Sequence, residues 1–383
     1  MKKKGAIKVA IVIDSLITYG GGEKVLHQLL KLYPDATVFT SISDRKLLKE
    51  FFPKIRIKNS FIQYIPFEKY FRRELYLLYP LAYRAFSFFS YDVVISISSA
   101  FAKYVRPWNR KTKHILYCLT PPKFFWMKEG RATKNITNLS YRFYAYFMGT
   151  FLERIWQYWD RKAARRADRV IAISNEVKDR IKKFYDLDSD ILYPPVEVSE
   201  IPFNKDKDTR ENWFLYMGRI ERYKGVHLAI AACAQAHIPL KIAGVGSQME
   251  DMKALVNELN AKGIIKLLGF PTDEQKYELM RKCKALIFPA RDEDFGIVPV
   301  EANAAGAPVI AYKGGGTVET ISESNPKTGV FFKEWNAREL ARTISEFDSQ
   351  EYDPHNCRKQ AEQFSAELFR YKFKGLVNDV QTA

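Results

Sequence analysis

The chain has 383 residues, of which 47% are hydrophobic and 14% are aromatic. Because a single core stops growing at roughly 250–300 residues, this length predicts two domains, and the apolar content excludes a largely disordered chain. The sequence has four cysteines and no C-x-x-C pair, which favours a reducing compartment over a disulfide framework or a zinc site. They are Cys118, Cys233, Cys283 and Cys357.

The formal net charge of +17 is unevenly distributed. Residues 1–200 contain 36 Lys and Arg against 19 Asp and Glu, and residues 201–383 contain 25 of each, so the whole excess lies in the N-terminal half. This asymmetry predicts that the half faces an anionic partner, which is a lipid headgroup layer, a polyphosphate or a nucleic acid. Ordinary solubilising surface charge is the alternative.

No targeting or membrane-spanning segment is predicted. The apolar stretch Ile7–Asp14 follows Met1 and three lysines, but it is only about one strand long and contains Lys8, unlike a signal peptide. No stretch reaches the ~18 uncharged apolar residues that a spanning helix needs. We therefore expect a cytoplasmic protein.

Short apolar runs alternate with amphipathic stretches along the chain, a pattern typical of parallel sheets with crossover helices. The expected strands of the first half are Ile7–Asp14, Ala36–Thr40, Asp92–Ser96, His114–Cys118 and Arg169–Ser174. The polar stretch Phe203–Asn212 is the expected linker. The second half begins with strands Trp213–Met217, Leu240–Ala243, Ile264–Leu268, Ala285–Phe288 and Pro308–Ala311. The prediction is an α/β protein with two doubly wound domains, 1–200 and 205–355.

The loop after Trp213–Met217 carries Gly218-Arg219 and Lys224-Gly225. Because a helix is expected from Val226, the two basic side chains can converge on a diphosphate beside a helix N-terminus. An ordinary solvated loop is the alternative.

Two glutamates, Glu293 and Glu301, flank the stretch Asp294 to Val300. If Gly296 and Ile297 open a helix, the two carboxylates are placed to contact opposite ends of one ligand, accepting hydrogen bonds from sugar and ribose hydroxyls. A solvated acidic patch and an exposed helix charge are the alternatives.

Three glycine-rich turns follow expected strands: Gly20-Gly21-Gly22, Gly244-Val245-Gly246 and Gly314-Gly315-Gly316. Glycine lets a backbone N–H approach a phosphate closely, although any tight turn uses it too. Three such loops at successive strand ends would line one cleft.

Taken together, these motifs resemble the family-four retaining glycosyltransferases of GT-B fold over nearly the whole chain. The resemblance rests on Gly218-Arg219, Lys224-Gly225, the segment Glu293 to Ile310, and Gly315-Gly316 with Glu319. It implies two Rossmann-like domains facing across a cleft, with the C-terminal helix 356–383 crossing back to the first. The segment from Glu293 to Glu301 resembles the corresponding sequence in members that build bacterial surface polysaccharides, often from GDP-mannose.

The resemblance also implies roles for residues. Arg219, Lys224 and Glu293 would act in catalysis, the first two by holding the donor diphosphate and the third by meeting the sugar. Donor-binding positions would be Gly21, Gly22, Gly218, Gly244, Gly246, Phe295, Gly296, Ile297, Val298 and Glu301, the last at the ribose. Thr120 and Pro121 would lie on the acceptor side. No metal or cofactor is expected, and the donor is a nucleotide-diphosphate sugar.

One position departs from the family pattern. Such mannosyltransferases usually have Tyr-Cys-His-Thr-Pro, whereas this chain has Leu119 where the histidine is expected, between Cys118 and Thr120. This weakens both a catalytic role for histidine and the choice of mannose. His114, on the preceding strand, is expected to be a core or edge histidine.

The acceptor is expected to be lipid-linked or a glycan, bound at an anionic membrane surface on the inner face of the cell membrane. Residues 64–89, with Arg72, Arg73 and Arg84, and residues 141–169, with Trp156 and Trp159, mix basic and aromatic side chains. Two ordinary helices that pack aromatics inward are the alternative.

Other functions stay open. A sugar-nucleotide epimerase or a phosphorylase has the same build, and a carbohydrate-binding relative without activity is a further alternative. Nucleic-acid binding is not expected, because no recognised module is present and the charge is scattered among apolar strands.

Overall fold

The computed structural model describes residues 7–66, 74–127 and 153–382. The described residues up to Tyr193 and from Arg370 onward form one compact unit, unit 1, and residues 194–369 form a second, unit 2. Arg72 and Arg73, and residues 141–152 of the second basic and aromatic segment, lie outside the described residues.

Unit 1 is built on a parallel sheet with the strand order β3-β2-β1-β4-β5-β6-β7. The strands are β1 (Val9–Ile13), β2 (Thr37–Thr40), β3 (Arg56–Asn59), β4 (Val93–Ser98), β5 (Lys113–Cys118), β6 (Arg169–Ala172) and β7 (Asp190–Ile191). β1 and β4 are buried along their whole length, as central strands of a sheet covered on both faces are. The order reverses between β1 and β4, which places the topological switch point there.

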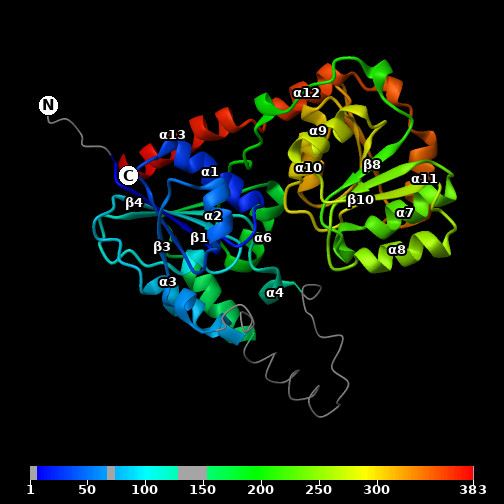
Figure 1. Cartoon of the computed structure of the whole chain (residues 1–383). Helices are drawn as coiled ribbons and strands as arrows, with labels where there is room; N and C mark the ends of the chain where they lie inside the picture. Colours follow the sequence, from blue (N-terminus) through cyan, green and yellow to red (C-terminus); the bar gives the residue numbers. More distant parts are fainter. Residues whose placement is uncertain (1–6, 67–73, 128–152, 383) are drawn as a thin grey trace, which may run out of the picture. The chain divides into compact units, whose positions relative to one another are not determined.

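The helices of unit 1 connect these strands (Figure 1). They are α1 (Gly21–Leu32), α2 (Arg45–Phe51), α3 (Tyr79–Arg84), α4 (Lys123–Trp126), α6 (Asn175–Tyr185) and the 153–164 helix. Much of α13 (Ala366–Thr382) belongs here too, because residues 370–383 join this unit and Arg370 donates a hydrogen bond to Gln28 of α1. The crossing segment is therefore shorter than the predicted 356–383.

Unit 2 has a second parallel sheet, with the order β10-β9-β8-β11-β12-β13. The strands are β8 (Phe214–Met217), β9 (Leu240–Ala243), β10 (Ile265–Gly269), β11 (Leu286–Phe288), β12 (Val309–Tyr312) and β13 (Gly329–Phe332). The helices are α7 (Val226–Gln235), α8 (Met249–Glu258), α9 (Asp273–Lys282), α10 (Ile297–Ala304), α11 (Ala337–Glu346) and α12 (Pro354–Glu362). α7 packs with α8 and α11, and α10 packs with α9 and α12, so helices cover both faces (Figure 1). The switch point lies between β8 and β11.

These two sheets confirm the predicted α/β fold with two doubly wound domains. The predicted linker, Phe203–Asn212, is wrong, because it is packed into unit 2. Asn204 donates from its backbone N–H to the oxygen of Ala305 at 3.0 Å, and Arg210 donates to the oxygen of Gly306 at 2.7 Å. The division falls instead after Tyr193.

Candidate functional site

The loop after β8 and the loop after β11 meet at the switch point of unit 2. Lys224 comes from the first loop and Glu293 from the second, and the ammonium lies 2.5 Å from the carboxylate. Their side chains are only 15% and 17% exposed, so the pair is mostly shielded from water and is not part of a solvated acidic patch. The two residues named from the motifs are therefore in direct contact.

Arg219 lies on the same loop as Lys224 and is exposed. One Nη atom of Arg219 donates to the phenol oxygen of Tyr223 at 2.8 Å, and the Lys224 ammonium lies 5.3 Å from the Tyr223 ring. Burial and the nearby Glu293 carboxylate raise the pKa of Tyr216, and Arg219 acts in the opposite direction on the same phenol. Arg219, Lys224 and Glu293 therefore share one electrostatic neighbourhood, and the Arg219 guanidinium contacts Tyr223 of its own loop.

Glu301 lies about one turn inside α10, and its side chain is only 2% exposed. Lys276, from α9, reaches it with its ammonium 2.7 Å from the carboxylate. A charge this deeply buried needs a partner, because the desolvation penalty is several kcal/mol. Glu301 is not an exposed helix charge, and Lys276 is a member of this region that the sequence motifs did not indicate.

Gly296 explains why α10 begins where it does. It precedes Ile297 with a φ of 101°, a left-handed backbone that glycine adopts at little cost. The neighbouring Phe295 is buried against the ring of Phe364, with 5.3 Å between the ring centres. Because its side chain is packed in the core, Phe295 can contact the donor only through its backbone. Ile297 and Val298 are half-buried.

Gly244 and Gly246 leave room for the neighbouring loop that carries Arg219, which is a different role from the predicted approach to phosphate. A Cβ on Gly244 would lie 1.9 Å from the oxygen of Gly218, and one on Gly246 would lie 2.2 Å from the oxygen of Ile220. The loop after β9 thus lies backbone to backbone along the loop that carries Arg219. These glycines position that loop, and their donor contacts stay a prediction.

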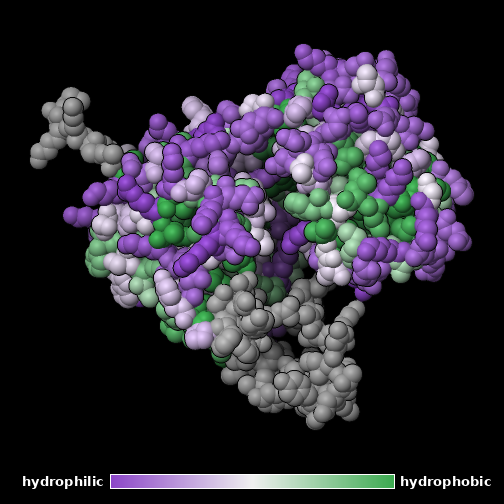
Figure 2. All heavy atoms as spheres, viewed as in Figure 1, coloured by the Kyte–Doolittle hydropathy of each residue, from purple (hydrophilic) through white to green (hydrophobic). Residues whose placement is uncertain are grey.

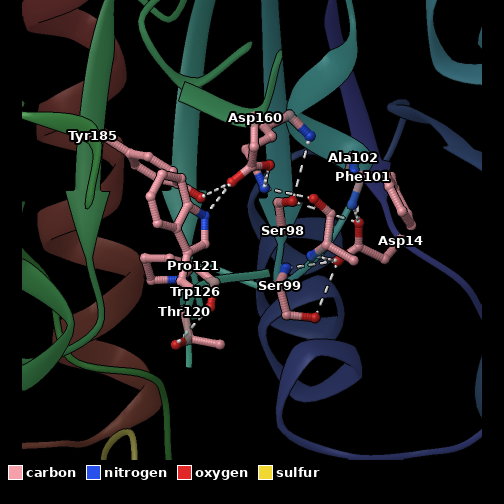
Figure 3. Close-up of polar contacts among 12 residues, drawn as sticks. Asp14, Ser98, Ser99, Phe101, Ala102, Thr120, Pro121, Trp126, Asp160 and Tyr185 are labelled. Atoms are coloured by element: carbon pink, nitrogen blue, oxygen red, sulfur yellow. Dashed lines mark hydrogen bonds and ion pairs between the residues drawn. The ribbon is translucent and has the colours of Figure 1, made fainter. Parts of the chain in front are cut away.

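At the switch point of unit 1, Asp14 directly follows β1, and its carboxylate lies against the loop after β4 (Figure 3). It accepts hydrogen bonds from four consecutive backbone N–H groups, those of Ser99, Ala100, Phe101 and Ala102, at 2.6 to 2.9 Å. This carboxylate holds the loop after β4 in place. An acid at the end of the first predicted strand was visible in the sequence, but its partners were not.

A second buried network lies beside it (Figure 3). The Lys103 ammonium is 2.8 Å from Asp160, and both side chains are at most 1% exposed. Asp160 also accepts hydrogen bonds from Trp126 Nε1 at 2.9 Å and the Tyr185 hydroxyl at 2.7 Å. The network connects the loop after β4, α4, the 153–164 helix and α6.

The predicted acceptor-side residues, Thr120 and Pro121, are buried. Thr120 accepts a hydrogen bond from Arg180 at 3.3 Å. Thr120 therefore has a structural contact with α6, and its predicted contact with the acceptor stays a prediction. Leu119 is half-buried, and a Cβ on Gly22 would lie only 3.2 Å from its Cδ1. The position of the missing histidine therefore lies over the start of α1, next to a glycine predicted to bind the donor.

His114 is a core histidine, as expected. It is 1% exposed, its Nε2 lies 2.7 Å from the Ser96 hydroxyl, and burial lowers its pKa to about 3. It stays neutral at physiological pH and does not replace the histidine missing at Leu119.

Gly21 and Gly22 open α1, and Glu23 follows them. One Glu23 carboxylate oxygen accepts the backbone N–H of Gly20 at 2.9 Å. Burial raises the pKa of Glu23 to about 7, and the Asp14 carboxylate acts in the same direction. The glycine turn is therefore held by a carboxyl group that changes charge near neutral pH.

Among the residues that the structure describes, no group of His, Cys, Asp or Glu side chains is arranged to hold a metal ion. In the same part of the chain, no helix is both long and apolar enough to cross a bilayer.

Two family models match the chain one after the other. "Glycosyltransferase Family 4" matches residues 19–200, and "Glycosyl transferases group 1" matches residues 197–364. Among curated proteins, an uncharacterized glycosyltransferase of Methanocaldococcus jannaschii is 28% identical over 195 residues, which are 51% of this chain and 54% of that protein. The O-antigen chain mannosyltransferase RfbU of Salmonella typhimurium is 28% identical over 172 residues, 43% of this chain and 48% of that protein. The chain thus spans about half the length of the curated relatives it matches.

Among solved structures, HepE of Anabaena in complex with UDP has a TM-score of 0.70 and 17% identity, over 97% of this chain and 100% of that one. At this identity the similarity shows the fold.

The Lys276–Glu301 pair provides a first prediction. Lys276→Met leaves the buried Glu301 carboxylate without its ammonium, so we expect a loss of about 3–5 kcal/mol in the free energy of unfolding. Lys282→Met is the control, because its ammonium lies on the same helix, is 50% exposed and pairs with Glu278 at 2.8 Å. Such exposed pairs contribute about 0.3–0.5 kcal/mol. Urea unfolding measures both, and equal losses would show that the burial of Glu301 has no energetic consequence.

A second prediction concerns Glu23. Its pKa in the folded chain is about 7, above the usual 4.5, so the folded state binds its proton more tightly than the unfolded state. Stability therefore falls as the pH rises from about 4.5 through 7, by at most about 3 kcal/mol. Glu23→Gln removes this loss, so we expect it to raise the melting temperature at pH 8 and to leave it nearly unchanged at pH 5. The exposed Glu50→Gln is the control, and a pH-independent effect of Glu23→Gln would contradict the prediction.

Proposed function

We propose that this chain, which belongs to the family-4 glycosyltransferases of GT-B fold, is a retaining hexosyltransferase. It would move a hexose, with mannose favoured, from a nucleotide-diphosphate sugar to a lipid-linked or polysaccharide acceptor in cell-surface glycan synthesis. The observation that carries the proposal is the Lys224–Glu293 contact at the switch point of unit 2. Ligands of doubly wound sheets bind at that place.

The proposed donor lies along this edge of unit 2. Arg219 donates hydrogen bonds to two oxygens of the diphosphate, and the Lys224 ammonium adds a positive charge beside it. α7 begins just after Lys224, and its N-terminus favours negative charge. Most of the rate enhancement then comes from groups already aimed at the charge that develops on the departing phosphate.

The Lys224–Glu293 pair has a consequence for this mechanism. Without donor, each charge of the pair is compensated by the other at 2.5 Å. When the diphosphate binds, Lys224 gains a stronger anionic partner, and Glu293 is released to accept hydrogen bonds from sugar hydroxyls. The pair would keep both groups ionised and in place until the donor arrives.

The ribose end is assigned to Glu301 in this proposal. Its carboxylate is fixed by Lys276 at 2.7 Å and lies on α10, whose first residue follows the Glu293 loop. A carboxylate held in one orientation accepts both ribose hydroxyls without a further loss of side-chain entropy.

Mannose and GDP are favoured by the motif around Glu293 and by the name of RfbU, a mannosyltransferase. HepE of Anabaena, in contrast, is in complex with UDP. Leu119 also stands where mannosyltransferases of this kind have histidine. The base is therefore the part of the proposal that most needs a direct measurement.

The acceptor side is proposed to lie in unit 1, in the cytoplasm at an anionic membrane surface. Support comes from the excess of basic residues in residues 1–200 and from the exposed aromatic side chains of this unit. No metal or other cofactor is included in the proposal, nor is nucleic acid a partner.

Arg219→Ala tests the catalytic assignment. Loss of one preorganised charged contact costs roughly 2–4 kcal/mol of transition-state stabilisation, so turnover should fall at least tenfold. Arg222→Ala is the matched control, because it removes the same charge from an exposed position three residues away. Unchanged turnover of Arg219→Ala on a defined donor would remove Arg219 from the mechanism. Turnover of donor alone, without acceptor, would favour an epimerase or a hydrolytic enzyme.

Nucleotide identity is tested by melting the full chain with GDP, UDP or ADP. A ligand at ~100 times its Kd that binds only the folded state adds about 2.7 kcal/mol to the stability. We expect the largest rise in melting temperature with GDP and a reduced rise for Arg219→Ala. A rise with UDP alone would replace mannose by a UDP-linked sugar, and no rise with any nucleotide would contradict the transferase proposal.

A further inference from the structure

Three arginines in the described part of unit 1 lie close together and pair with no described carboxylate. Arg84 ends α3, Arg106 lies in the loop before β5, and Arg166 lies in the turn after the 153–164 helix. Within the described ranges 7–66, 74–127 and 153–382, none of the three forms an ion pair with a carboxylate. Burial together with the positive charges of Arg84 and Arg106 lowers the pKa of Arg166 to about 10.

Several polar atoms of this cluster are buried without a hydrogen-bond partner. Among the residues that the structure describes, they are the Nε of Arg84 and the Nε and one Nη of Arg166. The Asp160 carboxylate is paired with Lys103 at 2.8 Å. Unsatisfied buried donors and converging like charges both cost free energy. An anion bound among the three guanidinium groups would offset the repulsion of their like charges.

Exposed apolar side chains surround this cluster. The guanidinium of Arg84 lies 5.1 Å from the ring of Trp159, and that of Arg106 lies 4.2 Å from the ring of Trp108. The two tryptophans are 41% and 56% exposed, and Leu81 of α3 is 55% exposed. Apolar side chains reach the surface among charged ones around α3 (Figure 2).

The 153–164 helix has two distinct faces. Asp160 and Ala163 are buried, whereas Tyr158, Trp159 and Lys162 face solvent, and Lys162 lies 5.8 Å from the Tyr158 ring. Amphipathic surfaces that combine aromatic and basic residues are typical of proteins that lie in the headgroup layer of a membrane. Aromatic rings and arginine stems suit the boundary between headgroups and acyl chains.

We propose that Arg84, Arg106 and Arg166 bind the phosphate group of an anionic membrane lipid, while Trp108, Trp159 and Leu81 enter the headgroup layer. The guanidinium fork matches phosphate geometry, which a lysine cannot reproduce. The site is built from α3, the loop before β5 and the turn after the 153–164 helix. It extends the proposed function by giving unit 1 a specific lipid contact.

The test is co-sedimentation of the full chain with phosphatidylcholine vesicles that contain or lack phosphatidylglycerol. We expect binding to the anionic vesicles and roughly 25-fold weaker binding for Arg84→Gln with Arg106→Gln, since each of the two basic residues near such a surface contributes about fivefold in affinity. Arg166 is left intact because its buried nitrogens are part of the packing. Arg45→Gln on α2 is the matched control and should change affinity by less than about twofold.

The apolar part is tested separately. Leu81→Glu should weaken binding to anionic vesicles, whereas Tyr371→Glu, which alters an 80% exposed aromatic residue on α13, should weaken it less. Equal binding by the wild type and the double arginine variant would overturn the site. Protection of the wild type by inorganic pyrophosphate in a melting experiment that is lost in the double arginine variant, without vesicle binding, would show that the arginines take a soluble anion and would overturn the lipid assignment.

These results are independent of the transferase proposal. Vesicle binding is measured without turnover, and the double arginine variant should keep the melting shift given by the nucleotide. Arg219→Ala should do the opposite, with a reduced nucleotide shift and unchanged vesicle binding. A failure of either proposal is therefore recognisable without reference to the other.

Discussion

The ion pair between Lys224 and Glu293 is the contact on which the candidate site depends. It joins the loops that follow two neighbouring parallel strands, β8 and β11, at the point where the strand order reverses. Parallel strands bring their carboxyl ends to one edge, but they do not fix the loops that leave that edge. The pair and the close contact of Gly315 with Glu293, where a Cβ would lie 2.4 Å from the backbone oxygen, do so.

The two switch points use a carboxylate in different ways. In unit 1, Asp14 is saturated by four backbone N–H groups, so its role is to hold the loop after β4. In unit 2, the Glu293 carboxylate pairs with the Lys224 ammonium at 2.5 Å, across two loops. The same strand arrangement thus uses a carboxylate to hold one loop through backbone N–H groups in unit 1 and to join two loops through an ion pair in unit 2.

The strands with apolar runs were predictable, because burial on both faces of a parallel sheet produces continuous hydrophobic segments such as that of β4. β3, β7 and β13 were not predicted. Alternate residues of β3 are exposed, and β7 has only two residues, so neither has such a run. The linker prediction failed at Arg210, because a polar sequence does not show that its guanidinium donates to backbone oxygens of Gly306 and Tyr352.

Sequence motifs named Arg219, Lys224 and Glu293 as candidate site residues, and the structure brings Lys224 and Glu293 into contact, whereas their catalytic roles stay predictions. Lys276 was not predictable, because nothing in the spacing of α9 connects it to a glutamate on α10, and only packing creates that pair. The arginine cluster has the same origin: Arg84, Arg106 and Arg166 are far apart in the chain and ordinary in composition. We infer an anion site from them because no described carboxylate pairs with the three guanidinium groups, and a folded chain seldom brings such groups together without one. The fold and the motifs therefore indicate the family. The uncompensated charge of the arginine cluster is visible only in the folded chain, and it is the basis for the proposed lipid phosphate site.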